Sequence, residues 1–481
     1  MKKNSLFVSL AFVLLVSAGG AQAQLQLPSP EEPDTSGEPS DGEFLSLPPR
    51  QQPTSESEDS KDSNEPAPRP SRSAEQRSRE PDPRPVMPAP LREEPEEGSR
   101  SPGRSEAEAS GLSYETMLTL DYFSNVAGGA TTGSALVGLW QGTVELDTGA
   151  MGLWEDGTVY VDLMYGFGTS PSDYAGDYQG ISNIDPGDVG FAVYEAWYEH
   201  AFPYAHGSLR LGVLDYNNDF DIAEYGNVFI NGAFGLDTAV GNSFAVSTYP
   251  RTTIGGRLRF QPSPHTYFML GGFDGGAGDA QTSAYVVDRN EGSLWVTEFG
   301  LDKGEAYSAG YYKLGLGMAY LKRPIDHFTE DEPEGNNPPA FQGNPYPGTG
   351  GVYLTSEMSL GDNMGLFFKA ARSDAANNRF STFYAAGMTY AGLIPGRAED
   401  VIGAGFVQTR HSDTFIQYVL DNALNNGNGY FRAESAYELT YSAQIARWLM
   451  IQPDFQYVLQ PGFDPTIGNA IEVGVRLQMV Y

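Results

Sequence analysis

Residues 469–481, at the end of the chain, alternate between apolar and polar side chains almost without interruption. Successive side chains of a β-strand point to opposite faces, so the alternation predicts a strand with one apolar and one polar face. The apolar face suits lipid better than a soluble core, because the opposite face is hydrated. The apolar set is Ile471, Val473, Val475, Leu477, Met479 and Tyr481, and the polar set is Glu472, Gly474, Arg476 and Gln478.

Similar alternating segments recur from residue 111 to the end of the chain. They predict 16 strands, an even number, in a region where glycine and aromatic residues are frequent and proline is confined to turn-like positions. The expected strands are 114–125, 135–147, 157–167, 190–201, 208–215, 251–261, 265–272, 293–300, 307–317, 350–360, 364–373, 380–391, 401–411, 434–444, 448–459 and 469–481.

The connections between these segments alternate in length. Every second one is short, as at 202–207 and 361–363, whereas most of the others are long, as at 216–250 and 412–433. Short turns at one end and long loops at the other are typical of outer-membrane barrels, in which closure leaves no unpaired backbone edge in lipid. We therefore expect an all-β fold, a 16-stranded antiparallel transmembrane β-barrel with long extracellular loops, in residues 111–481.

The chain before this region has a different composition. Residues 1–23 combine two lysines, a short apolar run and the small-residue pattern Ala21-Gln22-Ala23, which predicts a signal peptide cleaved after Ala23. Residues 24–110 are rich in proline and acids and hold one aromatic residue, Phe44. Such a segment buries too little apolar surface to offset the entropy of ordering it. We expect a disordered, acidic, Pro-rich periplasmic tether.

The overall charge excludes some classes of partner. The formal net charge is −33, and most of it falls in residues 111–481. Nucleic-acid binding is not expected, because phosphate partners require a basic surface. The chain contains no cysteine, so disulfide and thiol chemistry are excluded.

The hairpin at residues 208–261 holds the most concentrated charge. Its second strand sets arginines opposite Ile254, Leu258 and Phe260, and its joining loop is acidic. We expect the loop to bend inward, where Arg–carboxylate pairs would fix it and leave donors for solute hydroxyls. A solvated hairpin with incidental charges is the alternative. The expected constriction residues are Arg251, Arg257, Arg259, Arg210, Glu195, Trp197, Glu199, Asp162, Asp215, Asp219, Asp221 and Glu224.

Motifs for catalysis or cofactor binding are not found in the sequence. Glu195 and Glu199 could form a glycosidase pair, but acids that line a pore are the favoured interpretation. The spacing of Asp215, Asn217, Asp219 and Asp221 would suit an oxygen-ligated cation, although a solvated loop is favoured. We expect no enzyme activity, no metal and no cofactor.

Several local runs resemble the OprB-type carbohydrate-selective porins. The resemblance covers about residues 115–481 and implies a 16-stranded outer-membrane barrel that passes sugars by diffusion. The tether at 24–110 is longer than expected for that family, so the resemblance implies nothing about its role. The runs are GDYQGISNID (176–185), YEAWYEH (194–200), LRLGVLDYNNDFDIAEYGNVFINGAFG (209–235), YP before a Gly-Arg strand (249–259) and ELTYSAQIARWLMIQPDFQYVLQPG (438–462).

The favoured hypothesis is thus a passive channel for sugars or similar polyols in the outer membrane of a Gram-negative cell. The acidic charge motivates one alternative, a general or cation-preferring porin. Another alternative is a structural envelope protein anchored through the tether. The expected partners are sugars or other small neutral solutes, outer-membrane lipid and lipopolysaccharide, the cell wall through the tether, and further copies of the chain in a homotrimer.

Overall fold

The computed structural model describes residues 110–187, 189–244, 246–275, 292–322, 347–421 and 425–481. The expected signal peptide at 1–23 lies outside these ranges, and so does the expected tether at 24–110 except for its last residue. Both assignments stay predictions. Among the described residues, no helix has the length and apolar character needed to cross a membrane.

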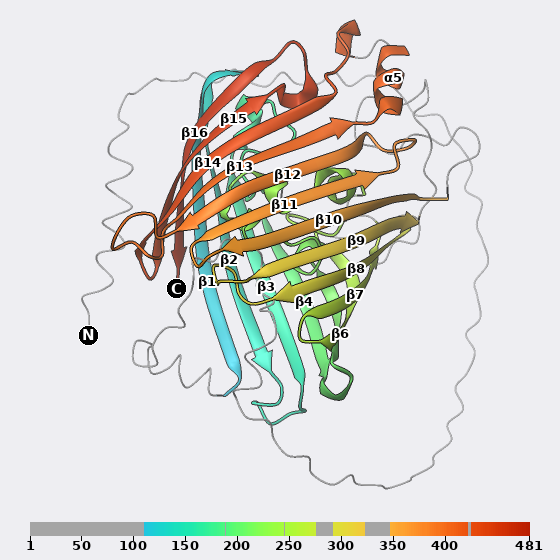
Figure 1. Ribbon diagram of the computed structural model, residues 1–481, viewed down its shortest axis with the longest axis vertical. Coiled ribbons are helices and arrows are strands. Elements are labelled where there is room, and N and C mark those ends of the chain that lie inside the picture. Colours follow the sequence, from blue (N-terminus) through green and yellow to red (C-terminus); the bar gives the residue numbers. More distant parts are fainter. Residues whose placement is uncertain (1–109, 188, 245, 276–291, 323–346, 422–424) are drawn as a thin grey trace, which may run out of the picture. The chain divides into compact units, whose positions relative to one another are not determined.

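The described strands form one closed antiparallel barrel of 16 strands, in which each strand pairs with its neighbours in the chain and β1 pairs with β16 (Figure 1). The strands are β1 (Leu112–Gly129), β2 (Gly133–Asp147), β3 (Gly157–Gly168), β4 (Phe191–Phe202), β5 (Gly207–Leu214), β6 (Thr253–Ser263), β7 (Thr266–Asp274), β8 (Ser293–Lys303), β9 (Tyr312–Lys322), β10 (Thr349–Leu360), β11 (Met364–Ser373), β12 (Phe380–Ala391), β13 (Val401–His411), β14 (Ala433–Ala446), β15 (Leu449–Leu459) and β16 (Gly468–Val480). The predicted fold class is confirmed.

One predicted strand was misplaced. The sequence suggested 307–317, but β9 spans Tyr312–Lys322. Tyr307 and Gly310 adopt positive φ angles of 57° and 84°. This left-handed backbone interrupts an extended strand, so the residues before 312 form the connection instead.

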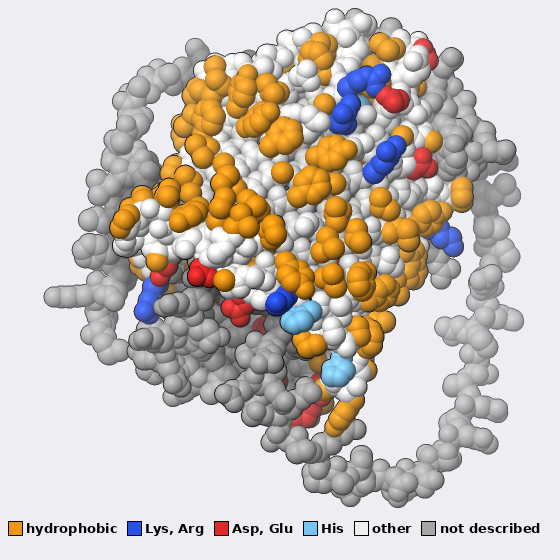
Figure 2. Space-filling view, viewed as in Figure 1, with side chains coloured by type: hydrophobic (Ala, Val, Ile, Leu, Met, Phe, Trp, Pro, Cys, Tyr) orange, Lys and Arg blue, Asp and Glu red, His pale blue; other side chains and the backbone are white. Residues whose placement is uncertain are grey.

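The outer face of the barrel is apolar, as expected for contact with lipid. In β16, Val473 is 47% exposed, whereas Glu472, Arg476 and Gln478 on the opposite parity are buried inside. The predicted inside–outside assignment of this strand is therefore confirmed. Figure 2 shows hydrophobic side chains spread over the outer surface of the strands.

The barrel interior differs from the hydrated lumen that the sequence suggested. Two connections fold inward, residues 169–190 between β3 and β4 and residues 215–252 between β5 and β6, and we call them the inward loops (Figure 1). They bring fully buried aromatic side chains, among them Phe220, Phe229 and Phe234, into contact with the inner wall. Phe229, for example, packs against Phe367 of β11 with ring centroids 5.6 Å apart. The apolar residues of these loops gain stability by leaving water.

The helices are short and lie in the connections. The inward loops contain α3 (Ser172–Ala175), η3 (Tyr216–Asn218), η4 (Gly226–Val228), α4 (Gly232–Gly235) and η5 (Thr238–Asn242). The other described connections contain η2 (Pro203–Ala205), α5 (Asp413–Asp421), η6 (Asn425–Gly427) and η7 (Pro461–Phe463).

Candidate functional site

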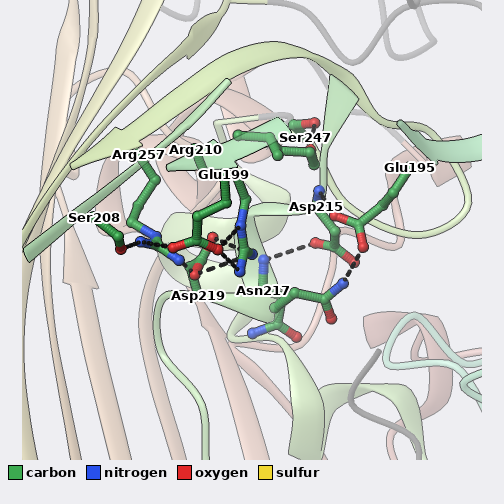
Figure 3. Close-up of polar contacts among 11 residues, drawn as sticks. Glu195, Glu199, Ser208, Arg210, Asp215, Asn217, Asp219, Ser247 and Arg257 are labelled. Carbon is green, nitrogen blue, oxygen red and sulfur yellow. Dashed lines mark hydrogen bonds and ion pairs between the residues drawn. The ribbon is translucent and has the colours of Figure 1, made fainter. Parts of the chain in front are cut away.

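Two arginines and two carboxylates meet inside the barrel, and we call Arg210, Arg257, Glu199 and Asp219 the charge quartet (Figure 3). Arg210 approaches Glu199 with an N–O distance of 2.7 Å and Asp219 with one of 3.2 Å. Arg257 lies 3.0 Å from both carboxylates. The side chains of the two arginines are each only 4% exposed. Each guanidinium thus bridges both acids in a closed network.

Strand register and loop geometry bring the quartet together. Arg210 of β5 pairs with Arg257 of β6 on one side and with Glu199 of β4 on the other. Asp219 comes from the inward loop at 215–252. The loop turns at η3, where the Asp215 side chain accepts a hydrogen bond from the backbone N–H of Asn217 at 2.7 Å. The expected inward bend of this loop and an Arg–carboxylate contact are both present.

Neighbouring side chains hold the two arginines in place. Arg257 donates a hydrogen bond to the Ser208 hydroxyl at 2.7 Å, a contact that the sequence did not suggest. The Arg210 guanidinium lies 4.0 Å from the centroid of the Trp197 ring, and Tyr160 stacks on that ring at 4.8 Å. Trp197 is itself buried, with only 3% of the residue exposed. Trp197 therefore orients Arg210 and presents no free ring face to a solute.

The other two arginines of the predicted set lie apart from the quartet. Arg259 of β6 stands over the Tyr267 ring at 5.0 Å, and no ion pair or hydrogen bond of its guanidinium is found among the described residues. Its donors are therefore available to a solute. Arg251 precedes β6 and pairs through its backbone with Thr248, so it is not part of the arginine ladder on the strand.

Three of the predicted acids, Glu195, Asp162 and Asp215, form a second group beside the quartet. Glu195 accepts hydrogen bonds from the backbone N–H of Asp215 at 2.7 Å and from the Asn218 side chain at 2.9 Å. Asp162 lies opposite Glu195 in the sheet and accepts a hydrogen bond from Gln141 at 3.2 Å. Burial raises the pKa of Asp215 to about 6, despite its hydrogen bonds from Tyr194 and Asn217.

Regular period-two alternation in β4 would place Tyr194 on the outer face, opposite to Glu195, but Tyr194 is buried. The register between β3 and β4 shifts between Asp162 and Leu163, so the extra residue in β4 is Tyr194. This β-bulge turns the side chain inward, where its hydroxyl donates a hydrogen bond to Asp215. A bulge therefore interrupts the period-two alternation of a strand.

The last two predicted acids, Asp221 and Glu224, pair with lysines on other strands. Asp221 is fully buried and forms an ion pair with Lys369 of β11 at 2.9 Å. Glu224 remains half exposed and lies 3.6 Å from Lys313 of β9. The inward loop therefore carries its acids to three different parts of the inner wall.

The two alternative chemistries gain no support from this geometry. The Glu195 carboxylate is engaged by Asp215 and Asn218, and the Glu199 carboxylate is engaged by the two arginines, so the two acids do not form a pair. Asp215, Asp219 and Asp221 bind Tyr194, Arg257 and Lys369 respectively, so they do not converge on one cation. Because these side chains are engaged by protein groups, the expectation that the loop is solvated was wrong. Among the described residues, no group of three or more His, Asp and Glu could hold a metal ion.

Four glutamates that the sequence analysis did not single out fasten the inward loops to the wall. All four are buried, and each accepts hydrogen bonds from backbone N–H groups of a loop. The contacts are Glu298 with Asp221 at 3.0 Å, Glu357 with Tyr225 at 2.7 Å, Glu434 with Gln179 at 2.9 Å, and Glu438 with Ile230 at 2.6 Å and Asn231 at 2.9 Å.

A sequence signal for these glutamates existed. Each is an acid at an inward position of a strand whose outward positions are uncharged and mostly apolar, as Glu438 is between Tyr437 and Leu439. Strand alternation alone predicts that such an acid faces the lumen. It does not tell which loop backbone the acid meets.

The comparisons with known proteins agree with the fold. A family model described as carbohydrate-selective porin, OprB family, matches residues 132–481. Porin B of Pseudomonas aeruginosa is 23% identical over 255 residues, which cover 47% of this chain and 54% of that protein. The chain thus spans about half the length of this curated relative.

Solved structures share the fold. The high-pH structure of Pseudomonas putida OprB matches with a TM-score of 0.71 and 18% identity, covering 79% of this chain and 96% of that one. The Salmonella typhi OmpF complex with daunomycin matches with a TM-score of 0.50 and 10% identity, covering 78% and 99%. The family model covers well over half of the chain, and the protein is accordingly an outer-membrane β-barrel that belongs to the OprB family of carbohydrate-selective porins.

Proposed function

We propose that this chain is a passive outer-membrane channel for sugars or similar small neutral polyols, with its selective constriction at the charge quartet. The fold and the family point to a channel rather than an enzyme. The observation that carries the proposal is the closed network of two guanidinium and two carboxylate groups on the inner wall. Its formal charges cancel, so it presents many donors and acceptors with little net field.

Such a network matches the chemistry of a sugar. Hydroxyl groups donate and accept hydrogen bonds, and paired Arg and carboxylate side chains offer both partners. Arg259 adds donors that no described ion pair occupies. Because Trp197 is buried, hydrogen bonding rather than ring stacking on Trp197 would provide recognition. A channel must also release its solute, so each contact has to be weak and replaceable.

Liposome swelling tests the proposal directly. Liposomes that contain the full-length protein should swell in isotonic mono- or disaccharide faster than in an isotonic polyol too large for the constriction. Sugars should also reduce single-channel current in a concentration-dependent way. A channel with strong cation selectivity and no current block by any sugar would refute the proposal.

A general or cation-preferring porin is the second candidate, and the net charge of −33 favours it. Reversal potentials in a salt gradient separate the two. The sugar channel should show weak ion selectivity because the quartet is balanced, whereas a cation-preferring porin should not be blocked by sugars.

We also propose that the channel assembles as a homotrimer and that residues 24–110 contact the cell wall. A detergent-solubilised particle with the mass of one chain would rule out the trimer. Deleting residues 24–110 tests the anchor, and it also tests the alternative of a structural envelope protein. Unchanged envelope integrity after this deletion would argue against both.

A further inference from the structure

The charged residues on the outer face of the barrel are all of one sign. Although the chain is strongly acidic, the exposed charged residues within the described strands are all basic, namely Lys303, Lys322, Arg372 and Arg410. Lys303 lies at the short-turn end of β8. The other three lie at the long-loop ends of β9, β11 and β13, which is the outer-leaflet side of an outer-membrane barrel.

Two of these residues stand in one row. Arg372 of β11 pairs with Thr382 of β12, and Thr382 pairs with Arg410 of β13. Adjacent strands are about 4.8 Å apart, so the two arginine Cα atoms are separated by about 10 Å with a threonine hydroxyl between them. Neither arginine has a carboxylate partner within the part of the chain that the structure describes. Asp374 follows Arg372 closely in the sequence, but its side chain accepts a hydrogen bond from the backbone N–H of Ala376 at 3.0 Å. The row is therefore an unneutralised cationic pair on the membrane side.

The same strands are hollowed below this row. An open depression of about 610 Å³ lies on β10–β13. Its lining includes the small outward residues Ser356, Ala386 and Ala404 and the larger Phe368 and Phe406.

The hollow and the row are aligned along the strands. Phe368 and Phe406 lie four residues below Arg372 and Arg410 on the same strands, a distance of about 13 Å. Figure 2 shows Lys and Arg side chains near the long-loop ends of these strands, with Asp or Glu side chains beside them, and many hydrophobic side chains below.

We propose that this face is a binding site for a phosphorylated, multiply acylated glycolipid of the outer leaflet, the chemistry of the lipid anchor of lipopolysaccharide. Arg372 and Arg410 would pair with headgroup phosphate, with the Thr382 hydroxyl as an additional donor, because guanidinium groups bind phosphate through charge-assisted hydrogen bonds. The hollow would accept an acyl chain. The proposal does not depend on which solute passes through the lumen.

Titration of the full-length protein with purified lipid A, followed by native mass spectrometry, tests the site. Arg372→Ala combined with Arg410→Ala should weaken lipid A binding about tenfold or more. Lys303→Ala removes another exposed outward cation, at the other end of the barrel, and should leave binding unchanged. Heat-modifiable mobility in gels and an unaltered channel current would establish that the variants are folded.

Further experiments distinguish lipid A from other ligands that could bind this face. Ala404→Leu fills part of the hollow and should weaken binding about threefold with the arginine row intact. Dephosphorylated lipid A and phosphatidylglycerol should both bind more weakly than lipid A. Unchanged lipid A binding by the double arginine variant, equal binding of phosphatidylglycerol, displacement of lipid A by millimolar inorganic phosphate, or a dimer seated on this face would each overturn the proposal.

Discussion

Arg257→Ala tests the constriction most directly. Arg257 uses three acceptors, with Nε donating to Asp219 at 3.0 Å and Nη1 donating to Glu199 at 3.0 Å and to Ser208 at 2.7 Å. Removing it leaves Arg210 to balance two carboxylates. The local charge then changes from zero to minus one, and the space of the guanidinium opens.

The expected change in ion selectivity follows from that charge. A monovalent cation about 5 Å from one uncompensated carboxylate gains about 0.8 kcal/mol in water. Screening at about 0.1 M salt reduces this to about 0.5 kcal/mol. Cations should therefore be enriched about two- to fourfold at the constriction and anions depleted by a similar factor. Conductance should rise, and sugar block should weaken because hydroxyl partners are lost.

Arg257→Lys separates charge from hydrogen-bond geometry. Lysine keeps the positive charge but lacks the planar fork that reaches Asp219, Glu199 and Ser208 together. Its reversal potential should match that of the unmodified channel while sugar block weakens. Arg372→Ala is the matched control, because it removes the same charge on the lipid-facing side and should leave both quantities unchanged.

The assay is single-channel recording in planar bilayers, with reversal potentials in a potassium chloride gradient and a sugar titration on the same channels. Folding is checked by heat-modifiable mobility. If Arg257→Ala left reversal potential, conductance and sugar block unchanged in a folded channel, the placement of the constriction at the quartet would be wrong.

Three further predictions concern the loops and the barrel wall. Burial is the main cause that raises the pKa of Asp237 to about 7, and the nearby charge of Asp221 adds to it. The folded loop prefers the protonated carboxyl, so this stabilisation is complete below about pH 4 and is lost as the pH rises through 7. Current noise should therefore increase between pH 6 and 8, and Asp237→Asn should abolish the increase. Lys369→Met leaves the buried Asp221 carboxylate unpaired and should destabilise the inward loop by about 3–5 kcal/mol, measured as faster proteolysis within 215–252, and adding Asp221→Asn should restore much of the protection. Val475→Arg near mid-strand should cost about 2–4 kcal/mol of unfolding free energy, whereas Ile471→Arg nearer the interface should cost about 0–1 kcal/mol, and equal losses in urea titrations would contradict the assigned membrane depth.

Much of the wall of the barrel was predictable because its pattern is local. A strand between lipid and lumen alternates residue by residue, so β16 reveals its two faces within a short segment. The same reasoning placed Arg257 inside and Leu258 outside. It failed where the backbone departs from regular alternation, at the bulge beside Tyr194 and at the left-handed residues before β9.

The candidate site was only partly predictable. The expected constriction residues included all four members of the charge quartet, because three lie on adjacent strands and the fourth on the loop that joins two of them. The partners of the remaining acids were not deducible in this way. Asp221, for example, pairs with Lys369, which lies far away in the sequence on β11.

The sequence by itself determined the number of strands, their faces and the hairpin that carries the arginines, since each depends on contrasts between neighbouring residues. The tertiary structure decided what fills the lumen. Closure of the barrel brings the inward positions of distant strands around one space, so Glu298, Glu357 and Glu438 can all bind the backbone of a single loop. Those contacts depend on distances across the barrel, which no local pattern encodes.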